Sequence, residues 1–337
     1  MTDWYFLLVP IAVLTVLLLF RFVGCTQEAF LGDPDEYEET VIADAPVAYF
    51  RFREKTGAVA INVMGGPNGA IGETVGPLDA GDPNWLSTTV AQPSIILGVT
   101  EPHLLQTDFS SYYSAFSFGG GYVAVPANVS PLNSLTEFTV EMLLYPQWDL
   151  EFGLGKYYCV LESADVVQIP GQTQPQLQKN AGFGIYAGPD NAADPASPYT
   201  WQFWVGVGQN GFERLSPVLP YPQPPNNPAP NPGPTVQPEI TYLAVTFSRS
   251  QNQAFLYLFN PNRDLDYTTY QLNALPYTEA AQQLYVGLTL QGPLFPPFTG
   301  PTLLYPFQGP IGELAIYDKV LDESTLRNHV INAFFNT

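Results

Sequence analysis

FTVEMLLY, residues 138–145, is the stretch that decides the fold class. Its residues are apolar, aromatic or β-branched apart from Glu141, and Pro146 follows directly. Such residues favour a pleated, buried strand. Proline cannot donate the hydrogen bond that a central strand needs in order to continue. The stretch therefore predicts a long, buried strand that stops at Pro146.

Short runs of the same character recur on both sides of this strand, separated by Gly, Pro and polar residues. Strands are expected at residues 47–52, 115–118, 122–125, 158–161, 182–186, 201–207, 240–247, 254–259, 284–290 and 311–317. Residues 119–121, Gly-Gly-Gly, join two of these runs and predict a hairpin. One helix is expected, at residues 322–334. Many short strands with so little helix predict an all-β protein, a two-sheet antiparallel sandwich or jelly roll.

The charge of the chain limits its partners. There are 31 Asp and Glu but only 11 Lys and Arg, which gives a net charge of −20. Such a surface repels phosphate backbones, so nucleic acid is not expected as a partner. It also repels anionic lipid headgroups. Any attachment to a membrane must therefore be hydrophobic.

An apolar run at residues 4–23 has about the length that spans a bilayer. Three interpretations compete: an uncleaved anchor, a cleaved signal peptide, and a lipoprotein signal that ends at Cys25. Residues 1–3 lack the basic character of a cleaved signal. Residues 22–25 resemble a lipobox, although Arg21 interrupts the apolar stretch before it. We expect a transmembrane helix that contacts the lipid bilayer, with lipidation of Cys25 as the alternative.

The remaining chain divides into two parts after the expected anchor at residues 1–24. Residues 25–45 are rich in Asp and Glu and poor in apolar residues, and they are expected to form a solvated acidic spacer. Residues 46–337 carry all the predicted strands and form the sandwich. Within it, residues 216–238 are expected to be a long surface loop, because proline at this density does not pair in a sheet.

Four segments, in order, resemble motifs of the laminin-G-like, concanavalin A-type lectin/glucanase superfamily. They are PVAYFRF at residues 46–52, FSFGG followed by YVAVP within residues 116–126, FTVE at residues 138–141, and FQGPIGELAIY at residues 307–317. The resemblance covers nearly everything after residue 46 and implies a concanavalin A-like jelly roll. It also implies an extracytoplasmic sandwich on a single-pass anchor, whereas Arg21 alone would place the sandwich in the cytoplasm.

The chemistry of the glucan-hydrolysing relatives is not matched. Those relatives carry three carboxylates in the order E-x-D-x-x-E on one strand face. Here Glu137 and Glu141 flank Thr139, and no third acid follows. We expect Glu141 to support a turn or to pair with Arg, and His103 and His329 to be ordinary surface or loop residues. The chain is therefore not expected to be an enzyme.

The resemblance also makes calcium plausible as a bound ion. Asp190, Asn191 and Asp194 form the best local cluster, and Asp79 with Asp82 form a weaker one. Solvated acidic loops are the alternative interpretation of both, and no other cofactor is expected.

Aromatic residues near these loops are candidates for binding a ligand or partner. They are Tyr199, Trp201, Trp204 and Tyr221. Trp201 and Trp204 differ by three positions, so on a strand they point to opposite faces, and one of them is expected in the core.

Two functions remain open at this point. In the first, the sandwich is a non-catalytic accessory subunit or protein-interaction module whose partners are other membrane-protein subunits. In the second, it is a surface carbohydrate-binding, lectin-like module.

Overall fold

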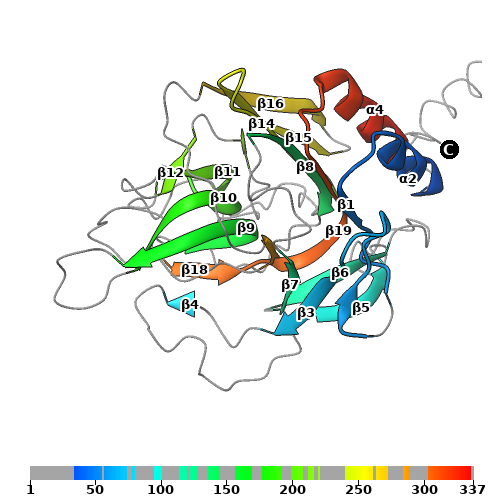
Figure 1. Ribbon diagram of the computed structural model, residues 1–337, viewed down its shortest axis with the longest axis horizontal. Helices are drawn as coiled ribbons and strands as arrows, with labels where there is room; N and C mark the ends of the chain where they lie inside the picture. The colour runs from blue at the N-terminus through cyan, green and yellow to red at the C-terminus, as the bar shows by residue number, and fades with distance from the viewer. Residues whose placement is uncertain are drawn as a thin grey trace, which may run out of the picture.

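The computed structural model describes residues 34–54, 57–73, 78–79, 95–100, 114–119, 121–126, 136–144, 156–168, 177–191, 199–207, 212–215, 219–220, 240–260, 263–271, 284–287 and 303–334. Most of these residues lie in strands, which form two sheets (Figure 1). The expected anchor and Cys25 lie outside the described residues. Within the described part, no helix has the length and hydropathy that a membrane span requires.

The elements follow one another in this order: α2 (Pro34–Ala43), β1 (Ala48–Phe50), β2 (Val59–Ala60), β3 (Gly69–Glu73), β4 (Leu78–Asp79), β5 (Ile95–Thr100), β6 (Ser114–Gly119), β7 (Gly121–Val125), β8 (Glu137–Leu144), β9 (Lys156–Gln168), β10 (Leu177–Pro189), β11 (Tyr199–Gly206), β12 (Phe212–Arg214), β13 (Leu219–Pro220), β14 (Thr241–Ser248), β15 (Gln253–Asn260), β16 (Arg263–Gln271), β17 (Leu284–Val286), β18 (Leu303–Pro306), β19 (Gln308–Tyr317) and α4 (Glu323–Phe334).

The first sheet is built around the stretch that decided the fold class. Its order is β16-β15-β14-β8-β19-β6-β5, and β1 pairs with β19. Strand β8 lies at its centre and pairs with β14 in unbroken register, with Phe138 opposite Phe247. The prediction of a long, buried strand here is confirmed, because every residue of β8 after Glu137 is buried.

The second sheet has the order β12-β11-β10-β9-β17-β7-β3-β2. Strand β13 pairs with β11, and β18 pairs with β4 and β9. The β18–β9 pair is parallel, with Leu303 opposite Lys156, whereas the other described pairs are antiparallel. The expected antiparallel two-sheet arrangement is thus found, with this one local exception.

The main core lies between the two sheets. Phe138 from the first sheet and Phe183 from the second meet there with ring centroids 4.7 Å apart. Strand β1 alternates: Ala48 and Phe50 point into this core, while Tyr49 points to the opposite face of the sheet.

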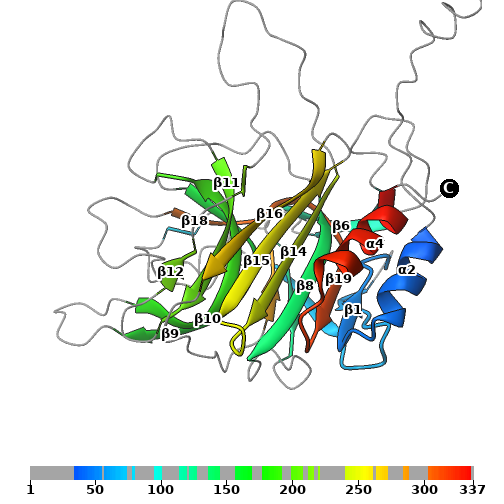
Figure 2. The same cartoon turned by 90° about the horizontal axis from the view of Figure 1, so that it is seen from above.

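Two helices cover that opposite face of the first sheet (Figure 2). Helix α4 begins within one residue of the prediction, where Oδ1 of Asp322 accepts a hydrogen bond of 2.8 Å from the amide of Thr325. Helix α2 was not predicted. It occupies residues that were expected to be a solvated spacer, and Tyr37 and Val41 are fully buried. The spacer prediction is therefore wrong for residues 34–43, because two apolar side chains four positions apart suffice to dock a short acidic helix.

Two other predictions need correction. The expected hairpin around Gly120 does not form, because β6 pairs with β19 and β5 while β7 pairs with β17 and β3. The chain crosses from one sheet to the other at this point, and the local sequence of such a crossing resembles that of a hairpin. Leu219 and Pro220 within the expected Pro-rich loop form the short edge strand β13, a place where proline is tolerated.

Candidate functional site

The outer face of the second sheet carries one of the predicted aromatic side chains. Trp204 lies there with Tyr157, Cys159 and Tyr186. Trp201 points to the opposite face, into the core between the sheets. The prediction that the two indoles face opposite sides is confirmed. Both are fully buried, so neither offers the exposed ring that was expected for binding.

Polar side chains on this outer face form a connected network. The indole nitrogen of Trp204 donates a hydrogen bond of 3.0 Å to Oε1 of Gln202. The amide nitrogen of Gln202 lies 2.9 Å from Oγ1 of Thr200 and 3.1 Å from the carbonyl oxygen of Gly188. Gly188 is required here, because a Cβ atom on it would lie 2.1 Å from the ring of Tyr157. This network explains why these polar groups tolerate burial.

A buried ion pair lies beside this network. The ammonium of Lys179 contacts the carboxylate of Glu162, and the hydroxyl of Tyr186 donates to the same carboxylate. Both charged side chains are fully buried. Burial, together with the Glu162 charge, raises the pKa of the Cys159 thiol well above its usual value. Lys179 and Glu162 neutralise each other's charge, and Cys159 stays a protonated, unreactive thiol.

The predicted metal residues are only partly described. Asp190 is exposed, and its carboxylate lies 3.1 Å from the guanidinium of Arg214. The same guanidinium donates a hydrogen bond of 2.7 Å to the backbone carbonyl of Asp190. A cation at Asp190 would therefore have to compete with Arg214. Asn191 is exposed beside it. No group of three or more His, Cys, Asp or Glu within the described ranges could hold a metal ion.

Several other candidates fall outside what the structure describes. Asp82, Asp194 and Tyr221 lie outside the described residues. Asp79 belongs to β4 and Tyr199 to β11, but only their backbone is described. These residues keep the status of expectations.

A charged interior site lies between the first sheet and the helices. Glu141 of β8 is fully buried, and Nδ1 of His329 on α4 lies 2.9 Å from its Oε2 atom. The other ring nitrogen, Nε2, is 2.9 Å from Oδ2 of Asp44, which follows α2. Tyr242 and Tyr317 also donate their hydroxyl groups to Glu141. We call these five residues the helix-sheet charge cluster.

This geometry fixes the charge of the imidazole. Burial by itself would lower the pKa of His329, but Glu141 and Asp44 raise it to about 9. Burial also opposes ionisation of Glu141, yet its pKa is held below the usual value by His329 and the two tyrosines. His329 is therefore an imidazolium that donates from both nitrogens. The expectations for Glu141 and His329 are wrong: the carboxylate pairs with histidine, and the histidine is buried in a helix.

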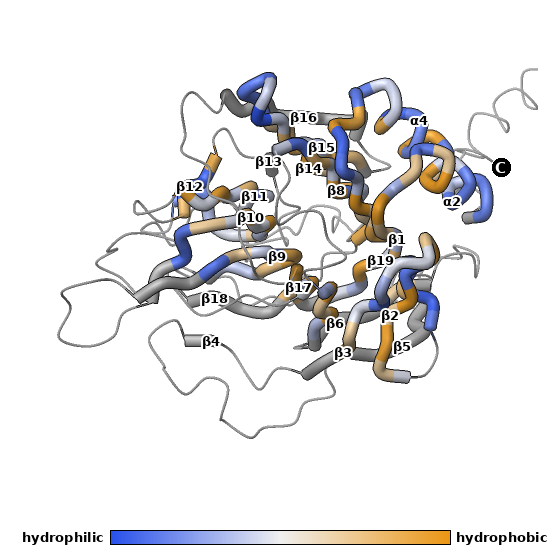
Figure 3. The backbone as a smooth tube through the Cα atoms, viewed as in Figure 1, coloured by the Kyte–Doolittle hydropathy of each residue, from blue (hydrophilic) through white to orange (hydrophobic). Residues whose placement is uncertain are grey.

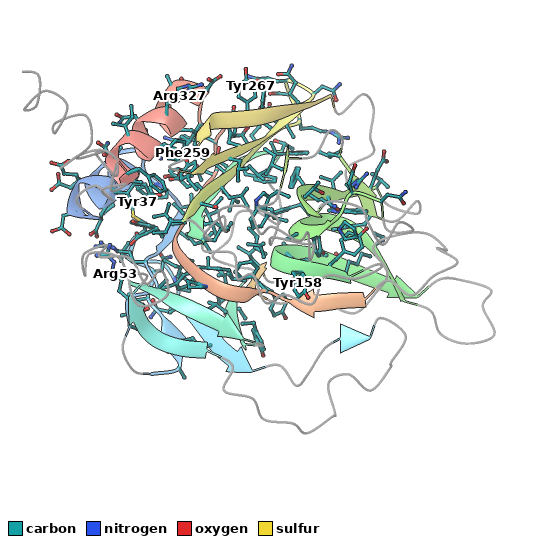
Figure 4. All side chains as sticks on the ribbon, turned by 180° about the vertical axis from the view of Figure 1, so that it is seen from behind. Tyr37, Arg53, Tyr158, Phe259, Tyr267 and Arg327 are labelled. Carbon is teal, nitrogen blue, oxygen red and sulfur yellow. The ribbon has the colours of Figure 1, made fainter. Side chains whose placement is uncertain are left out.

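A second carboxylate cluster lies where β19 runs beside β1. Glu313 is fully buried at a β-bulge, with φ of 52°. Its Oε1 atom is 2.7 Å from the guanidinium of Arg53, and Tyr49 donates to Oε2. Burial raises the pKa of Glu313 to about 7, against the opposing charge of Arg53. Figure 4 shows Arg53 and Tyr37 along the same edge of the molecule.

The two carboxylates that were weighed as glycosidase residues bind different partners. Glu137 and Glu141 lie on the same face of β8, four residues apart, which puts their Cα atoms about 13 Å apart. Glu137 contacts the hydroxyl groups of Ser248 and Ser250, away from the helix-sheet charge cluster.

An aromatic ladder with one exposed ring was missed in the sequence. Phe255 and Tyr257 of β15 have centroids 5.8 Å apart, and Tyr267 of β16 is 5.5 Å from Tyr257. The ring of Tyr267 is 43% exposed. Figure 4 shows Tyr267 on the same side of the molecule as Arg327 of α4. The alternation of Phe255 and Tyr257 was visible in the sequence. Strand β16 was not predicted, so nothing indicated that Tyr267 would lie beside them.

The comparisons with known proteins give distant likenesses only. No family model and no curated protein matches the chain. Domain 4 of AbnA, an extracellular arabinanase from Geobacillus stearothermophilus, has a TM-score of 0.42 and 13% identity over 84% of this chain and 97% of that chain. The binding domain of botulinum neurotoxin serotype D has a TM-score of 0.46 and 10% identity over 86% of this chain, which spans 51% of that chain. The CBM40 domain of a Ruminococcus gnavus sialidase has a TM-score of 0.36 and 14% identity over 61% of this chain and 91% of that chain. Likenesses at this level do not indicate a shared ligand.

Proposed function

We propose that the chain is a non-catalytic accessory subunit of a membrane assembly, with a concanavalin A-like jelly roll held outside the cytoplasm by an anchor at residues 4–23. The observation that carries this proposal is that α2 is packed firmly against the sandwich. The ion pair between Asp44 and His329, and the burial of Tyr37, join α2 to the sandwich. An anchor that precedes α2 in the chain would therefore be connected to a rigid sandwich, as a structural subunit requires.

Three buried carboxylates are consistent with the absence of catalysis in this proposal. Glu141, Glu162 and Glu313 are fully buried, and each is engaged by a cation within its own cluster. A general acid or base must reach a substrate, and these groups instead bind side chains of the same chain. Glu141→Gln should therefore lower stability, and a glucan-hydrolysis assay of the wild-type protein should give no turnover.

The test of the accessory role is isolation of the native protein from membranes in mild detergent. We expect it to migrate with other subunits and its mature chain to begin near residue 1. A monomer that begins at a lipid-modified Cys25 would contradict both the anchor and the accessory role. A monomer that retains residues 4–23 would contradict the accessory role alone.

A second candidate function, carbohydrate binding, is favoured by the aromatic ladder of Phe255, Tyr257 and Tyr267. Of these three rings Tyr267 is the exposed one, and it could stack against the apolar face of a sugar. The check is a glycan array with the wild-type protein and Tyr267→Ala. Binding that disappears in the variant would support this function, and the absence of any bound glycan would count against it.

A further inference from the structure

Exposed apolar side chains gather on one side of the molecule. Among the described residues, six large hydrophobic side chains are exposed, and all but Tyr267 lie on α2, α4 and residues 59–63. Figure 3 shows α2, α4 and β2 along the same side. We call the five side chains the apolar patch: Ile42, Val59, Ile61, Val63 and Ile331.

Residues 59–63 begin with the edge strand β2 and expose every second side chain. Val59, Ile61 and Val63 are 43%, 51% and 41% exposed, while Ala60 and Asn62 between them are buried. Strand β2 ends the order of the second sheet. An edge normally presents charged or polar side chains to solvent, which prevents unwanted association. Three exposed β-branched side chains at alternate positions instead favour a contact surface.

The two helices extend this surface. Asn332 donates a hydrogen bond of 2.7 Å to Thr40, and His329 contacts Asp44. Ile42 lies between Thr40 and Asp44 along the chain, and Ile331 lies between His329 and Asn332. The two isoleucines are therefore at the same height along the paired helices. Residues 59–63 adjoin the helices, because the next residue, Met64, packs against the apolar cluster beneath them.

The margin of the patch is acidic on α2, and on α4 the exposed Arg327 near Ile331 is neutralised by its ion pair with Glu323. Asp35, Glu36 and Glu39 are exposed on α2, and this helix contains no Lys or Arg. We propose that the apolar patch docks a partner protein whose contact surface is apolar at its centre and basic at its margin. This proposal rests on the accessory role and names the surface that would serve it.

Charge complementarity selects this occupant over two others. An anionic lipid leaflet would be repelled by the acidic margin. A second copy of the chain would bring the same acidic residues and a net charge of −20, so α2 would meet like charge. A basic margin on a different protein satisfies both the charge and the apolar centre.

The experiment is site-specific photo-crosslinking of the full chain in native membranes. p-Benzoylphenylalanine replaces Ile61, Ile331 or Tyr267 in separate variants. Ile331 and Tyr267 are 46% and 43% exposed, so they form a matched pair. We expect one protein adduct from positions 61 and 331 and none from 267. Glu36→Lys combined with Glu39→Lys should reduce this adduct at least about fivefold, the effect of losing a contact worth about 1 kcal/mol.

Three results would overturn the proposal: adducts with lipid or with a second copy only, equal adducts from all three positions, or no effect of the charge reversal. If a complex is isolated but crosslinks only from position 267, the accessory role stands and the proposed surface is wrong. If no complex and no adduct form, both fail.

Discussion

His329 carries a charge inside the protein because carboxylates hold both of its ring nitrogens. The groups that face it are Glu141 from β8, Tyr317 from β19, and Tyr37 and Asp44 from α2 and the turn after it. Its pKa is about 9 in the folded protein and 6.5 in the unfolded chain. The folded state thus binds this proton more tightly. The resulting stability is fully present below pH 6.5 and is lost as the pH rises through 9.

We expect the free energy of unfolding to fall by about 3 kcal/mol between pH 6 and pH 9.5 through this group, since one pKa unit corresponds to about 1.4 kcal/mol. His329→Gln should have a lower stability at pH 6 and a flatter profile over the same range. Denaturant titrations of both proteins at several pH values measure this. Parallel profiles would show that His329 does not carry the charge that we assign to it.

The Lys179–Glu162 pair gives a second expectation for single residues. Lys179→Met leaves the buried Glu162 carboxylate without its cation, and the loss should be about 3 to 5 kcal/mol. Lys179→Met combined with Glu162→Gln removes both charges and should cost clearly less. Urea denaturation of the wild type and the two variants compares them. A double variant that is less stable than the single one would contradict this account.

The helices differ in how far their sequence reveals them. Helix α4 was predicted to within one residue because Leu326 and Val330 are spaced four apart. Helix α2 was missed because its acidic residues outnumber Tyr37 and Val41, and only the tertiary structure shows what these two contact. Most strands of the sandwich core, such as β8 and β14, followed from the sequence pattern, whereas β5 and β16 did not.

What alternation could not show is which sheet a strand joins. Strands β6 and β7 are separated by a single residue and belong to different sheets. The helix-sheet charge cluster was equally hidden, because Asp44, Glu141 and His329 are far apart in sequence. Trp201 and Trp204 were named from their residue type, which does not report burial.

Neighbouring side chains on α2 provide a matched test of its packing. Val41 is fully buried and Ile42 is 40% exposed. Val41→Ala should lower the free energy of unfolding by about 2 kcal/mol because it opens a cavity. Ile42→Ala should change it by less than about 0.5 kcal/mol, since it lies on the surface. Thermal or urea unfolding distinguishes the two. Equal effects would mean that α2 does not pack as described.

The two sheets share one interior, and this makes the sandwich a single cooperative unit. Phe183 from β10 contacts both Phe138 of the other sheet and Phe203 of its own. A substitution at this position should therefore destabilise both sheets together.

Phe183→Ala should lower the free energy of unfolding by about 3 to 5 kcal/mol. Hydrogen exchange of amides in β14 and in β10 reports on one sheet each. We expect protection to fall by the same amount in both. A loss confined to β10 would show that the sheets unfold separately.

The first and last described elements of the chain contact each other: α2 packs on α4, and β1 pairs with β19. At about 5 to 20 residues per second, the ribosome needs tens of seconds to make the intervening chain. During that time Tyr37, Tyr49 and Glu141 lack their final partners. The nascent protein would therefore expose aggregation-prone surface until its last helix emerges. Its yield in cells should depend on chaperones that cover this surface.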